Sequence, residues 1–225
     1  MGSRIKLFFA VTIFSIAMGY LESAVVIYLR ELYYPHGFSF PMVATSTLVL
    51  KTELLRELAT VIMLACIGWM AGRTKAERFV YFLYSFAIWD IFYYVFLKAL
   101  LDWPTSFFTW DILFLIPVPW YGPVLAPCMI SLTMITFTLL ILYTESKNFL
   151  VRLDWRDWTI MIIASMIFIL SFTLEFFQWY TAGHYRLDTM GLDFIPHHYP
   201  WWLFGIGELI LLIELSRIYR RYLTR

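Results

Sequence analysis

Charged residues are scarce in this sequence. Of its 225 residues only 15% are Asp, Glu, Lys or Arg, whereas a soluble domain carries about 25%. Hydrophobic residues make up 61% of the chain, more than a soluble fold of this length can cover with so few charges. This composition excludes a soluble enzyme and a disordered tail. The net charge of +1 gives no attraction to nucleic acid.

Several motifs are also missing. The chain contains no P-loop, no G-x-S-x-G turn and no H-E-x-x-H pair, which excludes the common signatures of nucleotide binding, α/β-hydrolase catalysis and zinc proteolysis. Its ten glycines are few for a carrier whose helices must rock or unwind. We therefore lean towards a protein that is not an enzyme.

Long apolar runs are the dominant feature of the chain. About 20 apolar residues cross a hydrocarbon core as a helix, and these runs are too uniform for the alternating strands of a barrel. We predict a single domain over 1–225, an all-α bundle of six transmembrane helices. The predicted spans are 7–29, 42–70, 79–100, 122–143, 158–180 and 200–217.

Basic residues predict the orientation of the bundle. With the N-terminus in the cytoplasm, the side opposite holds only Arg30, Lys98 and Arg186, while nearly all other Lys and Arg lie in cytoplasmic segments. Both termini are therefore predicted to be cytoplasmic. The positively charged inner loops and the short chain without a tail favour a bacterial inner membrane, and the apolar run after Lys6 is too long for a cleaved signal peptide.

The connections allow two further predictions. In the outer segment 101–121, Thr105 or Ser106 is a candidate cap for a short interfacial helix that ends at Pro117, which we favour over a re-entrant loop. The spans can also form three helical hairpins, each with a rising helix that carries one acidic residue. These are Glu22, Asp90 and Glu175.

Ionisable residues inside the spans are the strongest indication of function. Each costs about 2.5–3.5 kcal/mol at the centre of a bilayer when ionised. The predicted spans contain six acidic residues but only two basic ones, Lys51 and Arg56. Protons, cations, water or a partner subunit must therefore compensate the excess negative charge. We therefore predict a cluster that handles protons or cations, or docks a partner. Its candidate residues are Glu22, Glu53, Arg56, Glu57, Asp90, Glu175 and Glu208.

The second span concentrates these groups on one face. At 100° per residue, Glu53, Arg56 and Glu57 share an arc with Ser46 and Thr60, and the spacing lets Arg56 bridge either glutamate. In the third span, Asp90 is expected to face the hydroxyl groups of Tyr93 and Tyr94. Buried pairs of this kind also serve only to fix helix packing, so a structural role stays open.

The histidines offer a separate, weaker hypothesis. All four lie on the predicted outer side, and His184, His197 or His198 with an aspartate form a conceivable metal site. Interfacial packing is the favoured reading, because adjacent histidines diverge. No histidine lies within a span, which excludes a bis-His haem in the membrane. We predict no cofactor, although the aromatic surfaces suit contact with a lipid, quinone or carotenoid.

Three functions remain compatible with these features. The leading one is a non-enzymatic integral subunit of a larger energy-converting or transport complex, held among other membrane subunits. The second is an autonomous proton- or cation-coupled transporter. The third is a membrane enzyme that acts on a lipid or isoprenoid and uses an outer metal site.

Overall fold

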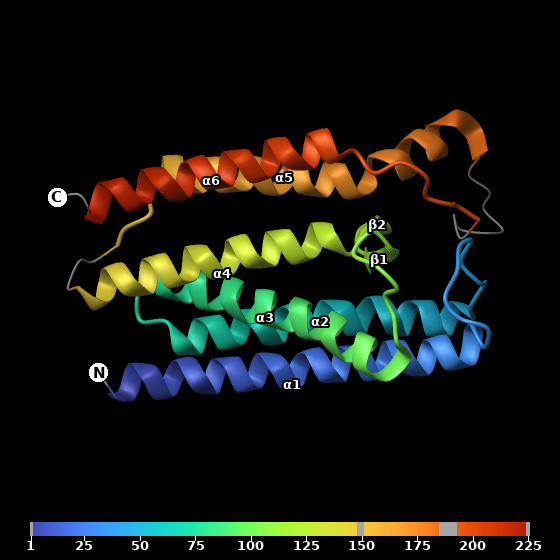
Figure 1. Cartoon of the computed structure of the whole chain (residues 1–225), viewed down its shortest axis with the longest axis horizontal. Coiled ribbons are helices and arrows are strands. Elements are labelled where there is room, and N and C mark those ends of the chain that lie inside the picture. Colours follow the sequence, from blue (N-terminus) through green and yellow to red (C-terminus); the bar gives the residue numbers. More distant parts are fainter. Residues whose placement is uncertain (1, 148–150, 185–192, 224–225) are drawn as a thin grey trace.

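The computed structural model describes residues 2–147, 151–184 and 193–223, which form six helices and one short β-hairpin (Figure 1). Five helices, α1 to α5, are long and apolar enough to cross a membrane. This confirms a multi-pass helical architecture and indicates an integral membrane protein in contact with lipid. The elements are α1 (Gly2–Tyr33), α2 (Thr47–Ala71), α3 (Lys75–Leu101), β1 (Trp110–Phe114), β2 (Trp120–Pro123), α4 (Leu125–Ser146), α5 (Trp155–Trp179), the π-helical turn η1 (Tyr180–His184) and α6 (Trp201–Leu223).

Side-chain caps determine where several helices begin. Ser46 accepts a hydrogen bond from the backbone N–H of Val49 at the start of α2, and Thr74 caps α3 in the same way. At the start of α5, Asp154 and Asp157 form a reciprocal capping box. Each cap satisfies N–H groups that the first helical turn leaves without a partner.

Helix α3 is the centre of the bundle and packs along α1, α2 and α4. Glycines allow this close approach: a Cβ on Gly19 would lie 2.9 Å from the carbonyl oxygen of Trp89, and one on Gly68 would lie 2.6 Å from the backbone nitrogen of Phe82. Helices α1 and α2 touch each other little, so the first two helices are not a closely packed hairpin. Helices α5 and α6 pack together and contact the remainder mainly through α4 and β2.

The segment predicted as an interfacial helix is a β-hairpin instead. Strands β1 and β2 pair antiparallel, with Ile112 opposite Tyr121. The prediction was wrong because Trp110, Ile112 and Phe114 are residues that favour strands, and because the hairpin is held by distant helices. Phe114 stacks on Phe86 of α3, with ring centroids 6.1 Å apart.

The two ends of the bundle differ. The start of α1 and the end of α6 lie together at one end, which we call the termini end (Figure 1). The β-hairpin lies towards the other end, which we call the hairpin end, although α1 and α2 extend beyond it (Figure 1). Residues of β1 line one cavity together with residues from the end of α1 and the start of α2. The residues predicted to carry function lie at several depths between them.

Candidate functional site

A cavity of about 160 Å³ lies at the hairpin end, between α1, α2 and β1. The loop that joins α1 to α2 also contributes to its wall, and the backbone N–H of Val43 donates to the hydroxyl of Tyr34 at 2.9 Å in that loop. Two of the predicted site residues, Glu53 and Glu57, therefore line a cavity. The charged residues in its wall are Arg30, Glu53, Glu57 and Asp111.

Arg56 is the centre of the charged group on α2. Its guanidinium donates to both carboxylate oxygens of Glu53, from Nε at 2.9 Å and from Nη2 at 2.5 Å. Its Nη1 forms a close ion pair with Glu22 of α1, and the hydroxyl of Thr60 donates to the same carboxylate. Arg56 thus joins two helices that otherwise touch little, which the spacing within α2 alone did not predict.

Glu57 follows Arg56 directly in α2 but does not form an ion pair with it. Its side chain is buried, and its Oε2 accepts a hydrogen bond of 2.9 Å from the backbone N–H of Leu115, just after β1. Within the described part of the chain, Glu57 has no ion pair, and its other carboxylate oxygen has no hydrogen-bond partner. We refer to Glu22, Glu53, Arg56 and Glu57 as the Arg56 cluster.

A second ion pair, between Arg30 and Asp111, lies in the wall of the cavity. Arg30, 8% exposed, lies 3.3 Å from the carboxylate of Asp111, which is 2% exposed. The hydroxyl of Tyr94 donates to the same carboxylate at 3.2 Å. Burial raises the pKa of Asp111 above its usual range, although Arg30 opposes this shift. Arg30 also lies over the ring of Trp103, with its Cζ 3.8 Å from the centroid.

Sequence reasoning missed this pair. Arg30 is expected on the outer side, and Asp111 lies in the outer segment 101–121 that is expected to form an interfacial helix. An aspartate that alternates with apolar residues would be expected on the exposed face of a strand, so no local signal predicts its burial.

The charges around the cavity do not balance. Four carboxyl groups, those of Glu22, Glu53, Glu57 and Asp111, face the two guanidinium groups of Arg30 and Arg56. A buried carboxylate is unstable unless an opposite charge, a proton or hydrogen-bond donors compensate it. Glu57 has the least compensation, because it has one backbone donor and no cation.

An apolar layer closes the cluster on the side of the termini end. Met18, Leu64 and Trp89 are buried together there, and Phe14 and Phe86 pack against them. Met18 lies one helical turn before Glu22, and Leu64 lies about two turns after Glu57. Among the described residues, no hydrogen-bond chain crosses this layer from the Arg56 cluster. The cavity and the Arg56 cluster are therefore separated from the termini end by an apolar layer.

The other predicted residues lie elsewhere. Asp90 accepts a hydrogen bond of 2.8 Å from Ser131 of α4, rather than from the tyrosines expected beside it. Glu208 of α6 accepts a hydrogen bond from Thr133, and its Oε2 is buried without a partner. Glu175 of α5 accepts hydrogen bonds from the backbone N–H groups that precede α6. These three residues couple helices in pairs and do not join the cavity.

Two of the histidines, His197 and His198, contact Glu175 through their backbone N–H groups. The N–H groups of His197 and His198 donate to Glu175 at 2.9 Å and 3.0 Å. His184 ends η1, and its side chain lies outside the described part, as do Arg186 and Asp188 entirely. Among the described residues, no three His, Cys, Asp or Glu side chains are placed to hold a metal ion.

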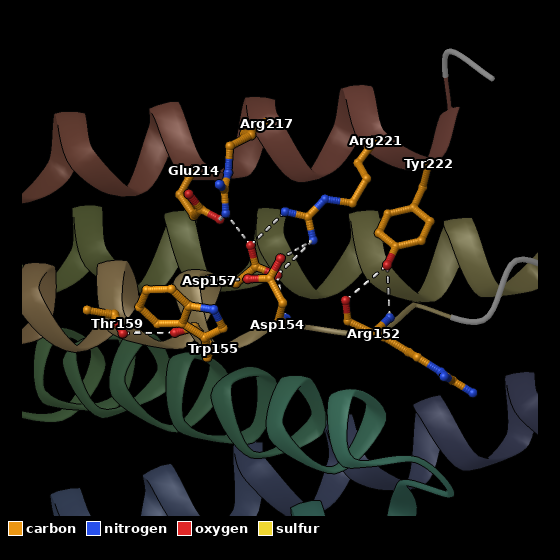
Figure 2. A network of polar contacts seen from close by, with 9 residues as sticks. All are labelled: Arg152, Asp154, Trp155, Asp157, Thr159, Glu214, Arg217, Arg221 and Tyr222. Carbon is orange, nitrogen blue, oxygen red and sulfur yellow. Dashed lines mark hydrogen bonds and ion pairs between the residues drawn. The ribbon is translucent and has the colours of Figure 1, made fainter.

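A further network joins α5 to α6 at the termini end (Figure 2). The Asp157 carboxylate is fully buried and accepts hydrogen bonds from Arg221 at 2.9 Å and from Arg217. Glu214 pairs with Arg217 at 2.8 Å, and the half-exposed Asp154 pairs with Arg221 at 3.4 Å. We call these five residues the Arg217 network. Its two buried carboxylates face two arginines.

No protein family, curated protein or solved structure matches this chain.

Proposed function

We propose that the chain is a non-enzymatic integral subunit of a larger energy-converting or transport complex, and that its hairpin-end cavity binds a cation or a proton. The observation that carries this proposal is Glu57, a buried carboxylate without an ion pair in the wall of a cavity already rich in carboxylates. A cation or proton in the cavity supplies the missing compensation.

The distribution of basic residues supports an orientation for the bundle. Arg73 lies in the loop between α2 and α3, Lys75 and Arg78 lie in the first turn of α3, and the end of α6 carries further arginines, all at the termini end. We place this end in the cytoplasm of a bacterial inner membrane, so that the cavity faces outward. In this arrangement α6 is the sixth span, and Arg217 and Thr133 compensate its two glutamates.

The surface of α2 supports a role within a complex. Leu48, Leu55, Trp69 and Met70 are each more than 60% exposed on this helix and need lipid or a neighbouring subunit as cover. The apolar layer beneath the cavity also favours binding by this chain over conduction through it alone.

Purification tests the subunit role. Extraction of the tagged chain in a mild detergent should retain other membrane proteins in fixed stoichiometry; a monodisperse chain without them contradicts a subunit. In liposomes, the isolated chain should move neither protons nor inorganic cations. A flux that Glu53→Gln or Glu57→Gln abolishes would establish an autonomous carrier instead.

Thermal unfolding tests the cation site. The unfolding midpoint of the chain is measured at equal ionic strength in chlorides of sodium, potassium, calcium, ammonium and small amines. At least one of these cations should raise the midpoint. The Glu57→Gln variant should lose this response. If no cation stabilises the wild-type chain at neutral or acidic pH more than the variant, the cavity does not serve this function.

A further inference from the structure

The wall of the hairpin-end cavity is mostly apolar, which restricts the kind of cation it suits. Calcium takes six to eight oxygen ligands, and magnesium needs a near-octahedral set. Here aliphatic side chains such as Val26, Leu50 and Leu115 line the cavity together with the carboxylates. The described residues also provide no metal-binding group of three. A ligand with an apolar body fits these walls better than a bare ion.

Aromatic side chains in the wall also favour an organic cation over a bare metal ion. Tyr33, Tyr34, Phe38 and Tyr93 line the same cavity. The faces of aromatic rings attract organic ammonium groups. One such contact is already present in the wall of the cavity, where the guanidinium of Arg30 lies over the ring of Phe38, with its Cζ 4.5 Å from the ring centroid.

The volume of the cavity sets the size of the ligand. An engineered cavity of about 150 Å³ in another protein holds benzene. At about 160 Å³ this cavity has room for a body of similar size. It therefore suits one small ring or branched chain with a short arm.

We infer that the hairpin-end cavity binds a small organic ammonium compound, with its N–H groups donating to the Glu57 carboxylate and its apolar body against Leu50 and Leu115. The buried position of Glu57 and its oxygen without a partner support this assignment. The inference rests on the proposed cation site and adds the class of its ligand.

Calorimetric titration of the full chain in nanodiscs tests the inference. The probe is 2-phenylethylamine hydrochloride, and its neutral match is 2-phenylethanol, which has the same apolar body. We expect the amine to bind more tightly than the alcohol by about tenfold or more, the effect of a hydrogen bond to a charged group. Glu57→Gln should remove this preference, whereas Asp154→Asn, at the opposite end, should keep it.

A second variant guards against misfolding of the first. Leu50→Trp narrows the cavity without a change of charge and should also weaken binding of the amine. Equal affinity for amine and alcohol, or unchanged amine binding in Glu57→Gln or Leu50→Trp, overturns the inference. If sodium or potassium stabilises the chain and displaces the amine, the ligand class is wrong while the proposed cation site stands. If no cation binds, both fail.

Discussion

The Arg56 cluster and the Arg217 network show two ways to keep buried charges in one bundle. In the Arg217 network, Asp157 and Glu214 face two arginines of α6, and Asp154 lies at the solvent edge. In the Arg56 cluster, one arginine serves Glu22 and Glu53, while Glu57 lines a cavity without an ion pair.

This difference is the one expected between a structural role and the proposed binding role. In the Arg217 network, two buried carboxyl groups face two arginines, and the third carboxyl group, that of Asp154, is half-exposed. In the Arg56 cluster one arginine faces three carboxyl groups, and the proposed ligand supplies further compensation. The following variants test whether the two regions differ in this way.

The largest effect is expected for Arg56→Gln. The change leaves the largely buried carboxylates of Glu22 and Glu53, whose side chains are 10% and 16% exposed, without their cation. This should lower the free energy of unfolding by about 4 kcal/mol. Reversible unfolding in detergent or bicelles measures the loss. Lower pH should restore part of it, because a proton on either glutamate replaces the guanidinium. A variant as stable as the wild type would contradict the central place of Arg56.

Asp157→Asn should have a somewhat smaller effect. It leaves Arg217 and Arg221 without their shared carboxylate, but both are about a quarter exposed and keep some hydration. We expect a loss of about 3 kcal/mol in the same assay. Acidic pH should not restore this loss, because the unpaired groups are arginines.

Asp154→Asn is the matched control at this end. Asparagine still caps α5, and the lost ion pair is half-exposed, so the change should cost less than about 1 kcal/mol. Equal losses for Asp154→Asn and Asp157→Asn would contradict the importance of burial in the Arg217 network.

Glu57→Gln should change stability little in the absence of added cations. Its amide oxygen can still accept the hydrogen bond from Leu115, so the free energy of unfolding should change by less than about 1 kcal/mol. The unfolding midpoint should nevertheless cease to respond to the stabilising cation. A large loss of stability without any change in this response would assign Glu57 to structure alone.

The smallest effect concerns the pH dependence of stability. Because burial raises the pKa of Asp111, the folded chain binds more protons than the unfolded chain between the two pKa values. The contribution of Asp111 to the free energy of unfolding should therefore fall as pH rises above about 4, by at most about 1.4 kcal/mol per pH unit. Asp111→Asn should flatten this slope.

Asp102→Asn provides the control for this slope. Lys98 holds the pKa of the exposed Asp102 carboxyl below its usual value, so this group contributes with the opposite sign. Its removal should not flatten the slope. If Asp111→Asn leaves the slope unchanged, Asp111 does not titrate as its burial implies.

Local sequence predicted the helices well, because hydropathy and capping act within a few residues. The expected span 79–100 lies within α3 (Lys75–Leu101), whose N-terminal cap is Thr74. The β-hairpin could not be predicted in this way. Its strands depend on packing against α3 and α5, and Trp120 stacks on Phe172 from a segment 52 residues later in the chain.

In the candidate site, too, contacts within one helix could be predicted from the sequence, whereas contacts between elements could not. The spacing on α2 predicted the contact between Glu53 and Arg56, since these residues are three apart on one helix. It did not predict that Glu22 is the second partner of Arg56, because helix order depends on tertiary packing. The pair of Arg30 and Asp111 joins residues 81 positions apart, and no local pattern links them.

A density map of the native assembly tests the central claim most directly. The account predicts density for a cation-bearing molecule in the hairpin-end cavity, within hydrogen-bond distance of Glu57, and a partner subunit against the exposed face of α2. A cavity filled by water or by its own side chains, with lipid all around α2, would contradict it.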